Sequence, residues 1–95
     1  MDLGLKGRKA IITGGSKGIG RAIANLLADE GCNVGICARN AEEVDVAVAA
    51  LKAKGVDACG SAIDVRDGDA VRKWVTDCAE ALGGLDIVVP NVSAL

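Results

Sequence analysis

Aromatic side chains and histidine are almost absent from this sequence. Its 95 residues contain one tryptophan, Trp74, and no phenylalanine, tyrosine or histidine. Any hydrophobic core is therefore built mainly from alanine, valine, isoleucine and leucine, and with thirteen glycines this composition suits helices packed closely on a sheet. Without histidine, and with no Cys-x-x-Cys pair among Cys32, Cys37, Cys59 and Cys78, a zinc site is not expected. We expect the four cysteines to be small buried hydrophobes in a reducing compartment.

The sequence also lacks an excess of either charge and any long apolar run. It carries 11 basic and 13 acidic residues, which gives no electrostatic reason to expect a nucleic-acid or membrane partner. Residues 1–8 lack the apolar run of a signal peptide. No segment approaches the roughly 20 apolar residues of a membrane span. A chain of 95 residues is long enough for one small domain, and we expect it to be cytoplasmic.

Short apolar runs alternate with segments of helical periodicity along the chain. The runs predict buried strands, and apolar residues that recur every three or four positions predict helices. Gly31 is a predicted C-cap of the first helix, and Asp67 is a predicted N-cap of the third. The predicted strands are residues 9–13, 33–38, 57–63 and 85–89, and the helices between them cover apolar positions within 19–27, 44–51 and 71–82. This β-α-β-α-β-α-β order predicts an α/β fold, a Rossmann-type doubly wound parallel sheet with strand order 3-2-1-4 and helices on both faces.

A glycine-rich segment, residues 13–20, joins the first predicted strand to the first predicted helix. Phosphate can bind at a helix N-terminus where backbone N–H groups are exposed and no Cβ is in the way. We expect Gly14 to let the chain leave the strand sharply, Gly18 to let the backbone approach a pyrophosphate, and Gly20 to allow close packing of helix on strand. Ser16 could add a hydroxyl donor. A plain strand-to-helix turn without a ligand is the alternative, and the spacing does not fit a phosphate-loop NTPase.

At these residues the chain resembles the short-chain dehydrogenase/reductase family. The cofactor loop of that family has the pattern Thr-Gly-x-x-x-Gly-x-Gly, which Thr13, Gly14, Gly18 and Gly20 match in full. The resemblance covers essentially all 95 residues. It implies a nicotinamide cofactor and an oxidoreductase that interconverts a carbonyl and a secondary alcohol on a small-molecule substrate. It also implies a homo-oligomer for the full-length protein.

The end of the second predicted strand favours NADP(H) over NAD(H). NAD-binding units place an acidic residue there, whereas an arginine accommodates a 2′-phosphate. Here no carboxylate occupies Cys37 or Ala38, and Arg39 follows directly. Lys17 would add a second positive charge, and the family resemblance associates this pair of basic positions with NADP(H). In the alternative, Arg39 is a solvated charge that pairs with the nearby acidic residues 42 and 43.

Two further positions follow from the resemblance. Asp64 and Val65 match the pair that contacts adenine in the family, although Asp64 could instead be a turn residue leading into a helix. Asn91 falls within the element that has the family pattern Asn-Asn-Ala-Gly after the fourth strand. This chain has Pro90-Asn91-Val92-Ser93 there, so the preceding Asn, the Ala and the Gly are replaced. The residues that we expect to bind the cofactor are Gly14, Ser16, Lys17, Gly18, Ile19, Arg39, Asp64, Val65 and Asn91.

The resemblance implies catalysis by a Ser, a Tyr and a Lys in a Tyr-x-x-x-Lys arrangement, and this sequence has no tyrosine. We therefore assign no catalytic residue within the 95 positions. We expect residues 1–95 to be a single cofactor-binding domain truncated before the catalytic half, with the molecule continuing past Leu95 or completed by a second chain. The alternative is a non-catalytic nucleotide-binding module or an inactive fragment.

Overall fold

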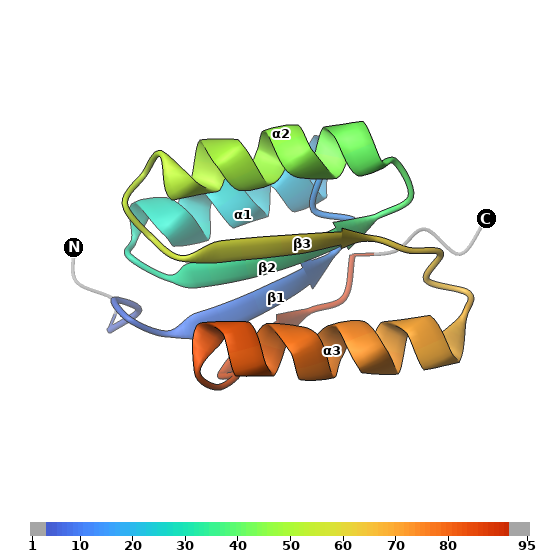
Figure 1. Ribbon diagram of the computed structural model, residues 1–95. Coiled ribbons are helices and arrows are strands. Elements are labelled where there is room, and N and C mark those ends of the chain that lie inside the picture. The colour runs from blue at the N-terminus through green and yellow to red at the C-terminus, as the bar shows by residue number, and fades with distance from the viewer. Residues whose placement is uncertain (1–3, 92–95) are drawn as a thin grey trace.

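The computed structural model describes residues 4–91 and contains one parallel sheet with helices on both faces (Figure 1). The strands stand in the order β3-β2-β1-β4, and neighbouring strands pair in parallel. In chain order the elements are β1 (Lys9–Thr13), α1 (Gly18–Asp29), β2 (Asn33–Ala38), α2 (Ala41–Lys52), β3 (Ala58–Ala62), α3 (Gly68–Leu82) and β4 (Ile87–Val89). The predicted α/β Rossmann-type fold and its strand order are confirmed.

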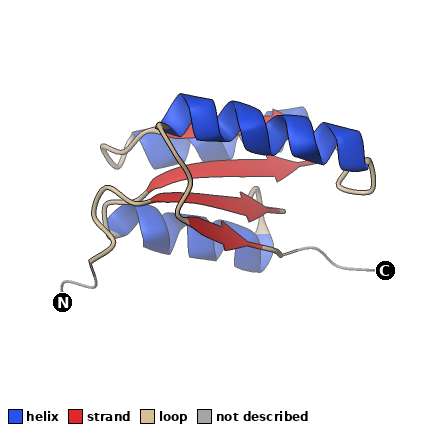
Figure 2. Cartoon of the chain, turned by 90° about the horizontal axis from the view of Figure 1, so that it is seen from below, coloured by secondary structure: helices blue, strands red, loops and turns tan. Residues whose placement is uncertain are grey.

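The helices form two layers around the sheet. Helices α1 and α2 lie on one face and α3 lies on the other (Figure 1). Strand β1 is central, because it pairs with β2 on one side and with β4 on the other. Seen from the α3 side, the four strands lie next to one another and β4 is the shortest (Figure 2). All four strands run in the same direction, so their carboxyl ends meet at one edge of the sheet.

Each face of the sheet has its own apolar core, because successive side chains of a strand point to opposite faces. Ile12 of β1 belongs to the core under α1 and α2, together with Ile36 and Leu51. Its neighbour Ile11 belongs to the core under α3, which contains Trp74. Strands β1 and β2 are covered on both faces, so they are continuous apolar runs and not alternating ones.

The observed strands and helix ends differ from the sequence prediction by a few residues. The third strand begins and ends one residue inside the predicted 57–63, and the fourth strand begins at Ile87 instead of residue 85. The side chain of Asp86 accepts a hydrogen bond from the Lys9 backbone N–H at 2.9 Å, which ties the start of β4 to the start of β1. Helix α1 has its C-cap at Glu30, and Gly31 follows with φ +88°, a left-handed conformation that glycine adopts without strain.

The expectation that all four cysteines are buried is wrong for one of them. Cys32, Cys37 and Cys78 are buried, but Cys59 on the edge strand β3 is half-buried. Its Sγ lies 3.1 Å from the Sγ of Cys78 on α3. Gly35 of β2 leaves room for both sulfur atoms, because a Cβ at this position would lie 2.8 Å from the Sγ of Cys78 and 3.2 Å from the Sγ of Cys59. Among the described residues, no group of histidine, cysteine, aspartate and glutamate could hold a metal ion.

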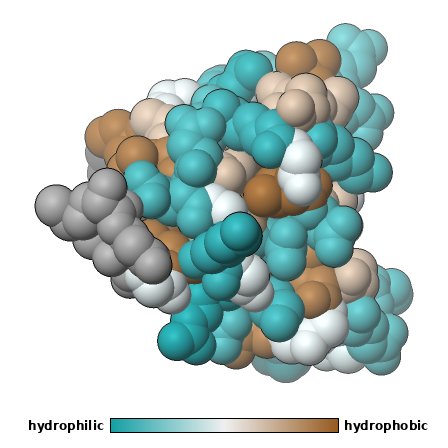
Figure 3. Space-filling view, turned by 90° about the vertical axis from the view of Figure 1, so that its left-hand side faces the viewer, coloured by the Kyte–Doolittle hydropathy of each residue, from teal (hydrophilic) through white to brown (hydrophobic). Residues whose placement is uncertain are grey.

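The end of the molecule where the strands begin is mainly hydrophilic (Figure 3). Ion pairs join neighbouring elements at this end. The Nη1 atom of Arg8 lies 3.7 Å from Oδ1 of Asp86. Beyond α2, the Nζ atom of Lys54 lies 2.5 Å from Oδ1 of Asp29 at the end of α1. Within residues 4–91, no helix is both long and apolar enough to cross a bilayer.

Candidate cofactor-binding site

The glycine loop, residues 14–17, leaves β1 and lies against the end of the neighbouring strand β2. Gly14 has φ +71°, so the chain turns sharply as it leaves β1. The N–H groups of Gly14 and Gly15 both donate to the carbonyl of Cys37, at 2.8 and 3.2 Å. A Cβ at Gly15 would lie 2.5 Å from the Cγ2 atom of Ile36. The loop can therefore pack on β2 only because Gly15 has no side chain, a constraint that the sequence did not reveal.

Asn91, the residue that follows Pro90 after β4, forms one wall of the glycine loop. Its N–H donates to the Thr13 hydroxyl at 2.8 Å. A Cβ at Gly14 would lie 2.6 Å from the Asn91 carbonyl oxygen, and a Cβ at Gly20 would collide with the Gly14 carbonyl and with the Asn91 side chain. Gly20 therefore permits the start of α1 to approach the loop and Asn91, not the strand as expected. Residues 92 and 93, where the sequence departs from the family pattern, lie outside the described residues.

The N-terminus of α1 differs from those of the other two helices. The side chains of Asn40 and Asp67 cap α2 and α3, and the predicted capping by Asp67 is confirmed. Lys17 at the N-cap of α1 makes no such bond, and the first turn contains no acidic residue. Gly18 has φ +63°, and apart from its chain neighbours and the backbone of its own helix, no described atom lies within 4 Å of the position that a Cβ would occupy. The N-cap side chain thus leaves the first N–H groups of α1 uncapped, and an anion could accept hydrogen bonds from them.

Ser16 and Ile19 flank this opening in different ways. Ser16 is only 4% exposed, and its hydroxyl donates to the Glu43 carboxylate on α2 at 3.4 Å. The predicted bond from Ser16 to a cofactor phosphate stays a prediction, since the hydroxyl has a partner in the protein. Ile19 in the first turn of α1 is 73% exposed. An apolar side chain at this position can contact the ring system of a bound ligand.

Arg39 and Asp64 lie close together at the carboxyl ends of β2 and β3. The Arg39 side chain is 72% exposed, and its Nη2 lies 3.8 Å from the Asp64 Oδ2. Among the described residues its ion pair is with Asp64, so the suggested pairing with Glu42 or Glu43 is not observed. Val65, the next residue, packs against the core under α3.

Arg66 is the residue of this cluster that the sequence analysis missed. Its Nε and Nη2 donate to the Asp64 carboxylate, at distances down to 2.8 Å, and its backbone N–H donates to Oδ1 at 3.0 Å. The hydrogen bonds from Arg66, helped by the charge of Arg39, hold the pKa of Asp64 well below its usual range. The only sequence signal was an arginine two positions after an aspartate in the turn before a helix.

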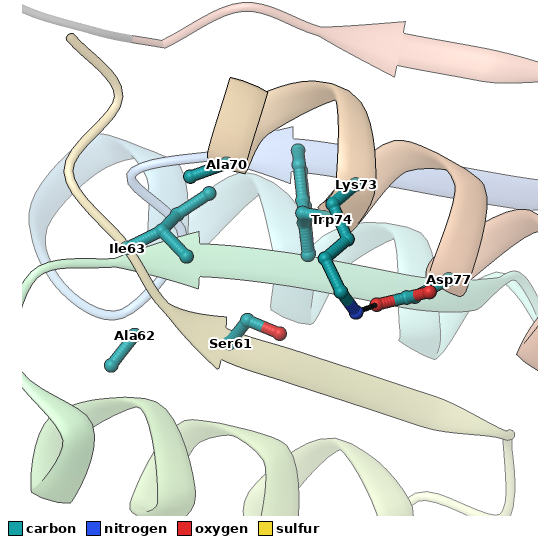
Figure 4. A pocket seen from close by; sticks show the side chains of 7 residues that line it. All are labelled: Ser61, Ala62, Ile63, Ala70, Lys73, Trp74 and Asp77. Carbon is teal, nitrogen blue, oxygen red and sulfur yellow. Dashed lines mark hydrogen bonds and ion pairs between the residues drawn. The ribbon is translucent and has the colours of Figure 1, made fainter. Parts of the chain in front are cut away.

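A separate hollow of about 350 Å³ lies between β3 and α3 (Figure 4). Lys73 and Asp77 form an ion pair of 2.7 Å at its side, and the buried Trp74 lies between them and Ile63. The indole Nε1 of Trp74 has no hydrogen-bond partner in the described part of the chain. This hollow lies beside α3, and none of the predicted cofactor residues lines it.

The predicted residues thus gather at the edge of the sheet where the strands end. The glycine loop follows β1, Arg39 follows β2, Asp64 follows the β3 region, and Asn91 follows β4. In open parallel sheets, ligands bind in the crevice outside the carboxyl ends of the strands. The arrangement can hold an extended anionic ligand, with one phosphate group at α1 and another at Arg39.

Comparison with known proteins identifies relatives over nearly the whole chain. The family described as short chain dehydrogenase matches residues 8–94. The chain is 38% identical to isoepoxydon dehydrogenase patN from Penicillium expansum over 98 aligned positions, which include 100% of this chain and 38% of that protein. It therefore spans less than two fifths of the length of this relative.

Solved structures show the same fold. The structure of L-sorbose reductase from Gluconobacter frateurii, in complex with NADPH and L-sorbose, has a TM-score of 0.92 and 39% identity, and covers 99% of this chain and 36% of its own. Carveol dehydrogenase from Mycobacterium avium, in complex with NAD, has a TM-score of 0.88 and 28% identity, and covers 93% of this chain and 36% of its own. Similar structures therefore occur with either nicotinamide cofactor.

Proposed function

The chain belongs to the short-chain dehydrogenase/reductase family, and on that premise we propose that it is the cofactor-binding domain of an NADP(H)-dependent oxidoreductase. The whole protein would interconvert a carbonyl and a secondary alcohol on a small molecule. The nicotinamide would supply or accept the hydride when bound. The residues of this chain would bind and orient the cofactor.

The observation that carries this proposal is the open N-terminus of α1. The N–H groups of its first turn, the left-handed Gly18 and the empty space beside Gly18 together form a cradle that a Cβ would narrow. A pyrophosphate fits this cradle, because it accepts several backbone hydrogen bonds and its charge is favoured at the positive end of the helix dipole. Asn91, which donates to Thr13, would hold the other side of the loop in place.

NADP(H) is favoured over NAD(H) by the end of β2. Arg39 presents an exposed guanidinium there, and residues 37 and 38 carry no carboxylate that would accept bonds from ribose hydroxyls. A guanidinium binds a phosphate through two parallel hydrogen bonds. The relation to a reductase solved with NADPH supports this preference, and the relation to a dehydrogenase solved with NAD makes it a point for experiment.

A non-catalytic nucleotide-binding module is the second candidate, because these 95 residues contain no tyrosine. The acid/base group that the family resemblance implies is a tyrosine. Binding of the cofactor without turnover of any carbonyl or alcohol by the full-length protein would favour this second candidate. Turnover would favour the oxidoreductase.

Titration of the full-length protein with NADPH and with NADH, followed by the fluorescence of the reduced nicotinamide, tests the proposal. We expect tighter binding of NADPH. Arg39→Ala should weaken NADPH binding roughly tenfold and leave NADH binding nearly unchanged, since a hydrogen bond to a charged group contributes about 1.5–3 kcal/mol and this side chain is exposed. Arg8→Ala is the matched control, because Arg8 lies at the opposite end of β1 and should affect neither cofactor.

Failure of both cofactors to bind would contradict the proposed function. Equal affinities for NADPH and NADH, unchanged in Arg39→Ala, would contradict only the preference for NADP(H). Loss of NADPH binding in Arg8→Ala would show that the measurement reports net charge and not a contact with the cofactor.

A further inference from the structure

The carboxylate of Asp64 lies within reach of two guanidinium groups. Arg66 donates from Nε to both carboxylate oxygens, at 3.1 and 3.2 Å, and from Nη2 to Oδ2 at 2.8 Å. Arg39 lies farther away, with Nη2 at 3.8 Å from the same Oδ2. Asp64 is therefore bonded to Arg66, whereas its contact with Arg39 is an ion pair without a hydrogen bond.

The pairing of Asp64 with Arg66 is built into the turn between β3 and α3. The Arg66 backbone N–H donates to Asp64 Oδ1 at 3.0 Å, and the Asp67 N–H donates to the Asp64 carbonyl at 2.9 Å. Asp67 in turn caps α3. The aspartate and the arginine are two positions apart in a turn held by these backbone hydrogen bonds, so the backbone keeps the two side chains close together.

Arg39 has two possible acceptors, the Asp64 carboxylate and the 2′-phosphate of NADP(H). A carboxylate already bonded to one guanidinium attracts a second one less strongly, because the charges of the first pair largely cancel at a distance. If Arg66 were absent, Asp64 would be an uncompensated anion whose Oδ2 lies 3.8 Å from Nη2 of Arg39. Arg39 would then form a hydrogen-bonded ion pair with it. The guanidinium would then have to leave Asp64 before it could bind a phosphate.

We propose that Arg66 is a positioning residue for cofactor specificity: by pairing with Asp64 it keeps Arg39 available to the 2′-phosphate. This inference rests on the proposed function. It assigns the preference for NADP(H) to three side chains on two strand ends, of which only Arg39 contacts the phosphate. Arg66 acts through Asp64.

Two ligand fragments that differ by one phosphate isolate this effect. Adenosine 2′,5′-bisphosphate and 5′-AMP are titrated as competitors of NADPH in the full-length protein, and the ratio of their affinities measures the contribution of the 2′-phosphate. Arg66→Ala should lower this ratio about two- to fivefold, the range that an exposed ion pair is worth. Arg66→Lys keeps the charge but cannot form the two-pronged contact, so it should give an intermediate ratio.

Removal of Asp64 separates positioning from a simple effect of charge. In an Asp64→Asn background, Arg66→Ala should leave the ratio unchanged, because no carboxylate remains to capture Arg39. If Arg66 instead attracts the phosphate through space, its removal should lower the ratio equally in both backgrounds. Arg72→Ala is the control, since Arg72 pairs with Asp69 on the outer surface of α3 and should not change the ratio.

An equal loss in both backgrounds, or no loss in Arg66→Ala, would overturn the positioning role while the proposed function stands. A ratio near one in the unaltered protein would overturn the preference for NADP(H) and this inference with it. We expect a ratio well above one in the unaltered protein and a lower ratio in Arg66→Ala. In the Asp64→Asn background, Arg66→Ala should leave the ratio unchanged.

Discussion

Alanine in place of Gly20 would put a methyl group where the structure leaves no space. A Cβ at this position would collide with the carbonyl of Gly14 and would lie 2.5 Å from the Nδ2 atom of Asn91. The Gly14 carbonyl belongs to a loop whose backbone is bonded to Cys37 on β2, so it cannot rotate away as a flexible side chain could. Either α1 or the glycine loop must shift.

The size of the effect follows from two opposing contributions. Inserting a methyl group into a packed site typically costs about 1–3 kcal/mol. Alanine also favours a helix over glycine by up to about 1 kcal/mol, which offsets part of this cost. Gly68 provides the matched control, because it is also in the first turn of a helix and a Cβ there would lie 3.6 Å or more from the end of the flexible Arg72 side chain. We therefore expect Gly20→Ala to be about 1–3 kcal/mol less stable than Gly68→Ala.

Urea denaturation of the two full-length variants, followed by far-UV circular dichroism, measures this difference in the free energy of unfolding. NADPH titration of the same samples should show weaker binding in Gly20→Ala only, because the displaced loop no longer presents the N–H groups of α1. Equal stability and equal NADPH affinity in the two variants would refute the steric argument, and with it the assignment of Gly20 as the contact between helix and loop.

Two further predictions concern the core and the cysteine pair. Leu51→Ala should lower the free energy of unfolding by about 2–5 kcal/mol in a denaturant titration, because Leu51 is 1% exposed in the core under α2. Iodoacetamide should label Cys59 faster than Cys78, and at a pH below that needed for an ordinary thiol. The hydrogen bond between the two sulfur atoms lowers the pKa of Cys59, and the same bond, with burial, raises the pKa of Cys78.

Each of these predictions has an internal control. Leu26→Ala removes the same side chain from a position that is 61% exposed, and should change stability by no more than about 0.5 kcal/mol. A comparable loss in both leucine variants would contradict the core assignment. Cys78→Ala removes the bond that stabilises the Cys59 thiolate, so the pH dependence of Cys59 labelling should move upward. An unchanged pH profile would show that the sulfur pair does not control the reactivity of Cys59.

The fold could be predicted from the sequence because each local signal agrees with the tertiary arrangement. The apolar runs of β1 and β2 are continuous because both faces of these strands are covered. Asp67 starts α3 because its side chain accepts hydrogen bonds from the N–H groups of Asp69 and Ala70. The fourth strand is shorter than predicted because pairing with β1 extends over only three positions. Pairing depends on a partner far away in the sequence, and the apolar pattern of residues 85–89 alone does not show where it begins.

The sequence predicted where the residues of the candidate site lie more completely than it predicted which side chains they contact. Gly14 follows β1, Gly18 begins α1 and Arg39 follows β2, all on the side of the sheet where the strands end. The bond from Ser16 to Glu43 and the pairing of Arg66 with Asp64 could not be predicted, because they depend on which side chains of α2 and of the β3–α3 turn lie alongside. Contacts of this kind are set by the packing of separate elements, and a single sequence carries little information about them.

The hydrogen bond between Asn91 and Thr13 also bears on how the site forms during synthesis. It joins residues 78 positions apart, and the bond from Lys9 to Asp86 joins residues 77 positions apart. Contacts between distant positions form late, because the entropy of closing a long loop must be lost before they are gained. On the ribosome, β1, α1 and β2 emerge long before Asn91 does. The glycine loop is therefore synthesised early, but Asn91 reaches it only after β4 has paired with β1. A nascent chain should therefore acquire affinity for NADPH late, after all four strands have paired.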